Sequence, residues 1–92
     1  MKYENVDDVL MECEGRTPDI GDYYGFMVNG LHIHCKSFRY CDSYLDLLNE
    51  KEHVIVRIYD RSKITKITIC NSNYWEEAGE LYIKDERKKV EA

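Results

Sequence analysis

The sequence predicts a mainly β protein, either a small curved antiparallel sheet or a partly open β-barrel, with one or two short helices. The first observation is the alternation of apolar and polar residues over 54–59 and 65–70, the period of half-buried strands. The second is Asn29-Gly30 between two apolar runs, a strong hairpin signal because both residues tolerate positive φ. The third is that 92 residues, 43% of them hydrophobic, are enough for one core but too few for two.

A short helix is expected near the N-terminus. Asn5 can cap it, and Asp7 and Asp8 fall in its first turn, where the helix dipole favours anions. Apolar residues recur at helical spacing: Val6, Val9, Leu10 and Cys13. Gly15 is expected to end this helix, and a loop follows to residue 22.

The remaining elements follow in order. Strands are expected near 23–28 and 31–35, followed by a second short helix over 44–49, capped by Asp42 or Ser43. Three leucines of that helix would seal the core: Leu45, Leu47 and Leu48. The two alternating runs then form a hairpin around a polar turn at 60–63. An irregular stretch with Tyr74 and Trp75 and an edge strand at 81–83 complete the expected fold.

The sequence predicts three regions: an acidic N-terminal arm with the short helix (1–22), a small β-barrel (23–84) and a charged C-terminal tail (85–92). The net charge is −5, but residues 1–22 hold two basic against seven acidic residues, whereas residues 57–70 hold four basic against one acidic. A pI near 5.1 argues against tight unspecific binding of nucleic acid, which depends on neutralising phosphates, but permits a local contact.

Targeting signals are not expected. The sequence has no run of about 18 apolar residues, and residues 1–10 lack the basic and apolar regions of a secretory signal. A cytoplasmic protein without a membrane association is therefore predicted. In a reducing compartment its four cysteines, Cys13, Cys35, Cys41 and Cys70, are interpreted as structural free thiols.

The histidines and cysteines suggest two kinds of site, a zinc site and a cysteine nucleophile activated by a histidine. His32 and His34 share one face of a strand while Cys35 points to the other, so this HxHC segment does not supply three convergent ligands. Further donors would have to come from Cys13, Cys41, His53 or Cys70. Nothing local marks Cys35 or Cys41 as a thiol activated by His34 or His53. No metal, cofactor, small-molecule substrate or enzymatic activity is predicted.

Basic residues of the alternating segments are candidate contacts to nucleic-acid phosphates, since lysine and arginine supply charge and hydrogen-bond donors. The candidates are Lys36, Arg39, Arg57, Arg61, Lys63 and Lys66. Tyr40 and Tyr59 lie close to them in the sequence. The competing interpretation is that such residues only keep strand edges from pairing with other chains.

A second candidate surface combines carboxylates with aromatic residues. Eight tyrosines exceed the needs of a small core, and tyrosine gives a large contact area at low entropic cost. The candidate partner-binding residues are Asp7, Asp8, Glu12, Glu14, Tyr23, Tyr24 and Trp75. Ordinary cross-strand packing is the competing interpretation of the aromatic residues.

Residues 26–78 resemble the small C-terminal β-barrel domain of Mu-type transposases. Val28-Asn29-Gly30-Leu31 corresponds to the first turn of the family pattern, and Phe38 or Tyr40 to its aromatic residue. The segments 44–48, 54–60 and 67–70 and the pair Glu77-Ala78 correspond to its later elements. Arg61 stands where the family has a proline, and Glu52-His53 where it has a glycine.

The resemblance implies a non-catalytic module that contacts DNA backbone or a transposition partner, because a separate domain of these transposases carries the metal-binding carboxylates. The alternative is a small acidic protein-interaction module or inhibitor, also from a mobile element, that binds a basic protein surface. The two hypotheses depend on opposite charges, so reversing the basic residues or neutralising the acidic ones distinguishes them.

Overall fold

The computed structural model describes residues 5–71 and 76–84, and its mainly β architecture confirms the predicted fold class. The elements are α1 (Val6–Cys13), β1 (Asp22–Val28), β2 (Leu31–Cys35), β3 (Ser37–Tyr40), β4 (Leu45–Leu48), β5 (Val54–Ile58), the 3-10 turn η1 (Arg61–Lys63), β6 (Ile64–Asn71) and β7 (Glu76–Ile83). Side chains are described for all of these residues except 76–78.

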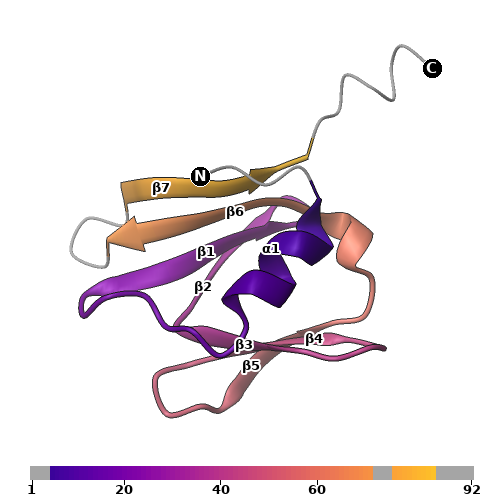
Figure 1. The fold of residues 1–92 in the computed structure, drawn as a ribbon, viewed down its shortest axis with the longest axis horizontal. Helices are drawn as coiled ribbons and strands as arrows, with labels where there is room; N and C mark the ends of the chain where they lie inside the picture. The colour runs from indigo at the N-terminus through magenta and orange to yellow at the C-terminus, as the bar shows by residue number, and fades with distance from the viewer. Residues whose placement is uncertain (1–4, 72–75, 85–92) are drawn as a thin grey trace.

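The strands of the described residues form two antiparallel sheets that do not close into a barrel. The larger sheet has the order β2-β1-β6-β7 and the smaller sheet the order β3-β4-β5. Figure 1 shows the smaller sheet at the bottom of the view and α1 in front of β1. The chain passes between the sheets at Lys36, whose backbone N–H donates to the carbonyl of Leu48 over 2.9 Å.

The N-terminal helix is confirmed. The side chain of Asn5 accepts a hydrogen bond from the N–H of Asp7 over 2.8 Å, as a helix cap does. Gly15 adopts a φ of +78° just beyond the helix. Val9 and Leu10 are fully buried, so α1 is an integral part of the core.

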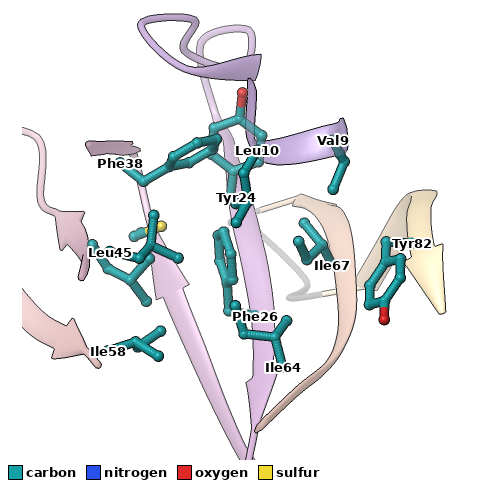
Figure 2. Close-up of a cluster of buried hydrophobic side chains, with 12 residues drawn as sticks. Val9, Leu10, Tyr24, Phe26, Phe38, Leu45, Ile58, Ile64, Ile67 and Tyr82 are labelled. Atoms are coloured by element: carbon teal, nitrogen blue, oxygen red, sulfur yellow. The ribbon is translucent and has the colours of Figure 1, made fainter. Parts of the chain in front are cut away.

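The Asn29-Gly30 hairpin is also confirmed. Asn29 and Gly30 have φ values of 51° and 83°, which match the twist of the flanking strands, β1 and β2. Tyr24 and Phe26 of β1 point into the core, where each meets the ring of Phe38 edge to face, with centroids 5.2 and 5.7 Å apart. Figure 2 shows these rings between α1 and the strands of both sheets.

The core between the two sheets is apolar. Its buried members are Val9, Leu10, Tyr24, Phe26, Cys35, Phe38, Leu45, Leu47, Ile58, Ile64, Ile67 and Tyr82. Alternation therefore leaves every second residue of the central strands on an outer sheet face. Polar side chains such as Asp46, Arg57 and Thr68 lie on these outer faces.

The second helix predicted over 44–49 is wrong, because Leu45–Leu48 form strand β4. All four residues are buried: Leu45 and Leu47 belong to the core, whereas Asp46 faces the other side, where Arg57 binds it. A six-residue helix has little intrinsic stability, whereas β4 gains backbone pairing from both β3 and β5.

The predicted hairpin of 54–59 with 65–70 is also wrong, although both strands exist. β5 pairs with β4 in the smaller sheet, whereas β6 pairs with β1 and β7 in the larger one. The polar segment 60–63 is a connection between sheets that contains η1, capped by the Asp60 side chain. Apolar alternation identified the strands but carried no information about their partners.

The C-terminal strand is longer than predicted, since β7 spans Glu76–Ile83 rather than 81–83. The expected irregular stretch around Tyr74 and Trp75 and the charged tail lie outside the described residues. Among the described residues, no helix has the length and apolar character needed to cross a membrane.

Candidate functional site

Three of the predicted basic residues, Lys36, Arg57 and Arg61, bind polar groups of the chain itself. The Lys36 ammonium donates to the carbonyl of Asp22 over 2.6 Å and to that of Asp19 over 3.3 Å. Arg57 and Arg61 each bind a carboxylate of the chain itself. Arg39 and Lys63 are exposed, and Lys66 is half-buried on β6.

Arg57 is held on the outer face of the smaller sheet by Asp46. Its Nε and Nη2 donate to the two carboxylate oxygens of Asp46 over 2.7 and 3.0 Å. Arg39, Asp46 and Arg57 occupy one row across β3, β4 and β5. The Asp46 side chain is fully buried, and its hydrogen bonds from Arg57 lower its pKa. The guanidinium also lies 4.0 Å from the centroid of the Tyr44 ring.

A second basic group surrounds η1. Arg61 donates to Asp7 of α1 over 3.0 Å and lies 4.8 Å from the Tyr40 ring centroid. The Lys84 ammonium donates to the carbonyl of Ser62 over 2.9 Å, which brings a cation that sequence analysis missed close to Lys63. Hydrogen bonds from Ser62 lower the pKa of Asp60, and Lys63 and Lys84 lower it further.

An open groove of about 410 Å³ adjoins this basic group, between α1 and η1. Its lining includes Asp7, Asp42 and Asp60 but a single cation, Arg61. The lining is therefore mainly acidic and suits a polyanion poorly.

Several predicted partner-binding residues are engaged within the fold. Tyr24 was wrongly placed at a surface: it is 3% exposed, donates to the carbonyl of Arg16 over 3.0 Å, and burial raises its pKa to about 12. The Tyr23 hydroxyl donates to Glu50. The Glu14 carboxylate accepts from the backbone N–H of Tyr40.

The rest of the acidic set lies on α1 or outside the described residues. Asp7 is paired with Arg61, as described above, while Asp8 and Glu12 are exposed. Trp75 is outside the described residues. Only Asp8 and Glu12 of the described set therefore present carboxylates that no described contact engages.

Strand β5 is a surface feature that sequence analysis missed. Within the described part of the chain β5 pairs with β4 alone, so one side of its backbone has no neighbouring strand. Val54 and Ile55 are 47% and 48% exposed, so two consecutive apolar side chains of β5 face solvent. The strand carries neither lysine nor proline, two residues that commonly protect an edge. Its charged residue, Arg57, is paired with Asp46, and its register with β4 shifts between Leu47 and Leu48.

The other edge of the same sheet is protected. The Glu14 carboxylate occupies the backbone N–H of Tyr40 on β3, as noted above. Near β5, by contrast, Tyr59 is 72% exposed and meets the ring of Tyr44 edge to face at 6.5 Å. With Arg57 these rings form an aromatic and cationic group beside an open strand edge, a composition typical of protein interfaces.

The predicted thiol and histidine candidates lie in different environments. Cys35 lies in the core, and burial raises its pKa to about 12, so its thiol is not activated. Cys13 and Cys41 are half-buried, and His53 is exposed. Among the described residues, one group of histidine, cysteine or acidic side chains is compact enough to hold a metal ion: His32, His34 and Cys70.

Comparison with known proteins gives no relative from which a function could be transferred. No family model matches the sequence, and neither a curated protein nor a solved structure shows significant similarity to it.

Proposed function

We propose that this protein is a non-catalytic protein-interaction module that receives an extended, apolar segment of a partner protein along β5. The observation that carries the proposal is the open β5 edge with half-exposed Val54 and Ile55. An added strand would gain main-chain hydrogen bonds from this edge and side-chain contacts from alternate residues.

The surroundings of β5 support such a contact. Tyr44, Arg57 and Tyr59 are large side chains already held by one another and by Asp46, so binding would order few new rotamers. Tyrosine and arginine are also the residues that most often dominate binding energy at interfaces. The partner segment is therefore expected to alternate apolar residues and to place one of them against Tyr59.

Peptide selection tests this proposal directly. A displayed library of random peptides is selected on the wild-type protein, and synthetic versions of the selected peptides are titrated by isothermal calorimetry. Backbone amides of β5 that point away from β4 should then become protected from hydrogen exchange. Ile55→Lys should weaken binding at least about tenfold, because it places a charge on the edge.

The matched control is Leu31→Lys on β2, because Leu31 is also exposed (67%) and also lies on an edge strand. This variant should bind the peptides like wild type. Equal weakening by both substitutions, or protection confined to other strands, would contradict the proposal. A β5-dependent dimer in sedimentation equilibrium would contradict it as well, because the occupant would then be a second copy.

A second candidate function, contact with DNA backbone as the transposase resemblance implies, is favoured by the basic group at η1. Lys84 joins Lys63 there although the two residues are distant in the sequence. Under this hypothesis the affinity for a labelled DNA duplex should fall steeply with salt, with a slope of about one per phosphate contacted.

The variant that tests the DNA hypothesis is Lys63→Glu, with Lys51→Glu in the turn before β5 as the control. Fluorescence anisotropy at two salt concentrations should show lost binding for the first and unchanged binding for the second. Binding that is insensitive to salt, or equal for both variants, would exclude backbone contact at η1.

A further inference from the structure

The outer face of the larger sheet holds a compact group of metal-binding side chains. His32 and His34 stand on β2 and Cys70 on β6, and one ligand atom from each lies within 4.8 Å of those of the other two. β1 runs between these strands, with Gly25 opposite His34 on one side and Thr68 on the other. The two imidazole rings have centroids 4.4 Å apart.

Gly25 keeps the space between these donors open. A Cβ atom at this position would lie 2.8 Å from each of three atoms, the Sγ of Cys70, the Nε2 of His32 and the Oγ1 of Thr68. Gly25 has no positive φ, so its backbone conformation suits any residue and does not explain the glycine. A glycine inside a strand weakens it, and such a residue often marks a place where a ligand approaches closely.

Burial gives the group an inner and an outer side. Cys70 and Thr68 are 0% and 1% exposed even though they lie on the face away from the core. The Thr68 hydroxyl lies 3.4 Å from the Cys70 sulfur. His34 is half-buried and His32 is exposed, so an ion would enter past His32 and meet the thiol at the inner end.

We propose that His32, His34 and Cys70 form a binding site for a zinc(II) ion. Two imidazoles and one thiolate are a donor set typical of zinc, and zinc distances of about 2.0–2.3 Å require donors roughly 3.3–3.6 Å apart. The three side chains therefore need to close by about 1 Å around the ion. On binding, the S–H bond of Cys70 breaks, its electron pair is donated to the metal, and the proton passes to solvent.

Three protein ligands leave the fourth position of a tetrahedral site open. Met27 stands opposite His32 on β1, on the same face of the sheet, and a solvent water is the other simple ligand. The proposed site is separate from β5, so it adds a function to the proposed interaction module. Sequence analysis named Cys70 among four possible further donors but predicted no metal. Cys35, the cysteine beside the HxH pair, is in the core, and the third ligand comes from β6, whose position in the sheet the sequence does not reveal.

Cobalt titration tests the site, because Co²⁺ occupies zinc sites and a bound thiolate gives a charge-transfer band in the near ultraviolet. The reduced protein should bind one equivalent of Co²⁺ with that band and release it when Zn²⁺ is added. Cys70→Ser should abolish the band. His32→Gln, a substitution at an exposed position, should lower Zn²⁺ affinity at least about 100-fold in competition with a chelator.

Matched controls are Cys41→Ser and His53→Gln, which change a cysteine and a histidine outside the group and should leave binding unchanged. Circular dichroism establishes that each variant is folded, and His32→Gln decides the question if Cys70→Ser does not fold. A wild-type protein that binds neither Co²⁺ nor Zn²⁺ would overturn the proposal. So would a band that survives Cys70→Ser, unchanged affinity in His32→Gln, or binding of copper alone.

Discussion

The outer faces of the two sheets bury polar side chains in different ways. On the smaller sheet, buried Asp46 is matched by Arg57, which closes over it with two hydrogen bonds. On the larger sheet, buried Thr68 and Cys70 lie close to His32, and Gly25 leaves space among them. The first arrangement satisfies its own charges and is structural, whereas the second is a set of imidazole and thiol donors that a cation would complete.

The largest expected effect tests the structural half of this comparison. Arg57→Met keeps the aliphatic stem but leaves a buried carboxylate without its partner, so the free energy of unfolding should fall by about 2–3 kcal/mol. Urea denaturation measures this change. The double variant Asp46→Leu with Arg57→Met should recover most of the loss, because no buried charge remains.

The control for this variant is Arg39→Met, which removes the exposed cation at the other end of the same row. Its effect should stay within about 0.5 kcal/mol. Equal losses in Arg57→Met and Arg39→Met would show that Asp46 depends on the general field of the face and not on the Arg57 pair.

The next effect tests the larger sheet. Gly25→Ala should lower the free energy of unfolding by about 1–2 kcal/mol, since the new methyl group meets three atoms at 2.8 Å. The matched control is Gly79→Ala on β7, where a Cβ atom meets nothing within 4 Å. That substitution should be neutral or stabilise by up to about 1 kcal/mol.

Thermal and urea unfolding of both glycine variants in the metal-free state measure this difference. If Gly25→Ala were as well tolerated as Gly79→Ala, the donors would not be held close together, and the contrast between the two faces would disappear.

Features fixed by neighbours in the sequence were predictable here. Asn5 caps α1 through the residue two positions on, and Asn29-Gly30 sets the β1–β2 turn through its own φ angles. The strand period of β5 and β6 was also visible, because alternation is a local property. These signals give the elements but not the sheet in which each strand lies.

Pairing between distant strands explains what could not be predicted. The three leucines of β4 fit the residue spacing of a helix as well as that of a strand, so the sequence predicted a helix there. Pairing with β3 and β5 on its two sides favours the strand. His32, His34 and Cys70 come together because β1 lies between β2 and β6 in the larger sheet. The edge of β5 is open because β6 pairs with β1 and β7 and not with β5. Sequence analysis placed Arg57 and Arg61 in solvent because it could not see that Asp46 and Asp7 face them.

Low pH tests the smaller sheet in a second way, because it protonates Asp46 and so removes the negative charge of the Asp46–Arg57 pair. The pKa of Asp46 is lower in the fold than in the unfolded chain, so its pairing stabilises the protein above pH about 4 and is lost as pH falls through the folded pKa. The difference in unfolding free energy between wild type and Asp46→Asn should therefore be constant near neutral pH. It should shrink as the pH falls below about 4, because the unfolded chain then takes up a proton at Asp46 before the folded protein does.

Urea denaturation at a series of pH values measures this difference. Asp60→Asn is the comparison, because the pKa of Asp60 is also lowered but its side chain is exposed. A difference that stays constant down to pH about 2 would mean that Asp46 is held by its packing and not by its charge.

The smallest expected effect concerns an ion pair that is exposed to solvent, and it shows how much such a pair stabilises the fold without burial. Asp7 binds Arg61 at a 3.0 Å distance but keeps 45% of its side chain exposed, so Asp7→Asn should cost only about 0.5 kcal/mol. Asp8→Asn is the matched control, because both residues lie in the first turn of α1 and lose the same interaction with the helix dipole. The difference between the two variants isolates the ion pair. It should vanish in high salt, whereas the loss in Arg57→Met should persist there, since salt screens exposed charges and hardly reaches a buried one. A difference that survives high salt would show that the Asp7–Arg61 pair is shielded from solvent like the Asp46–Arg57 pair. The ion pair would then hold α1 firmly against η1.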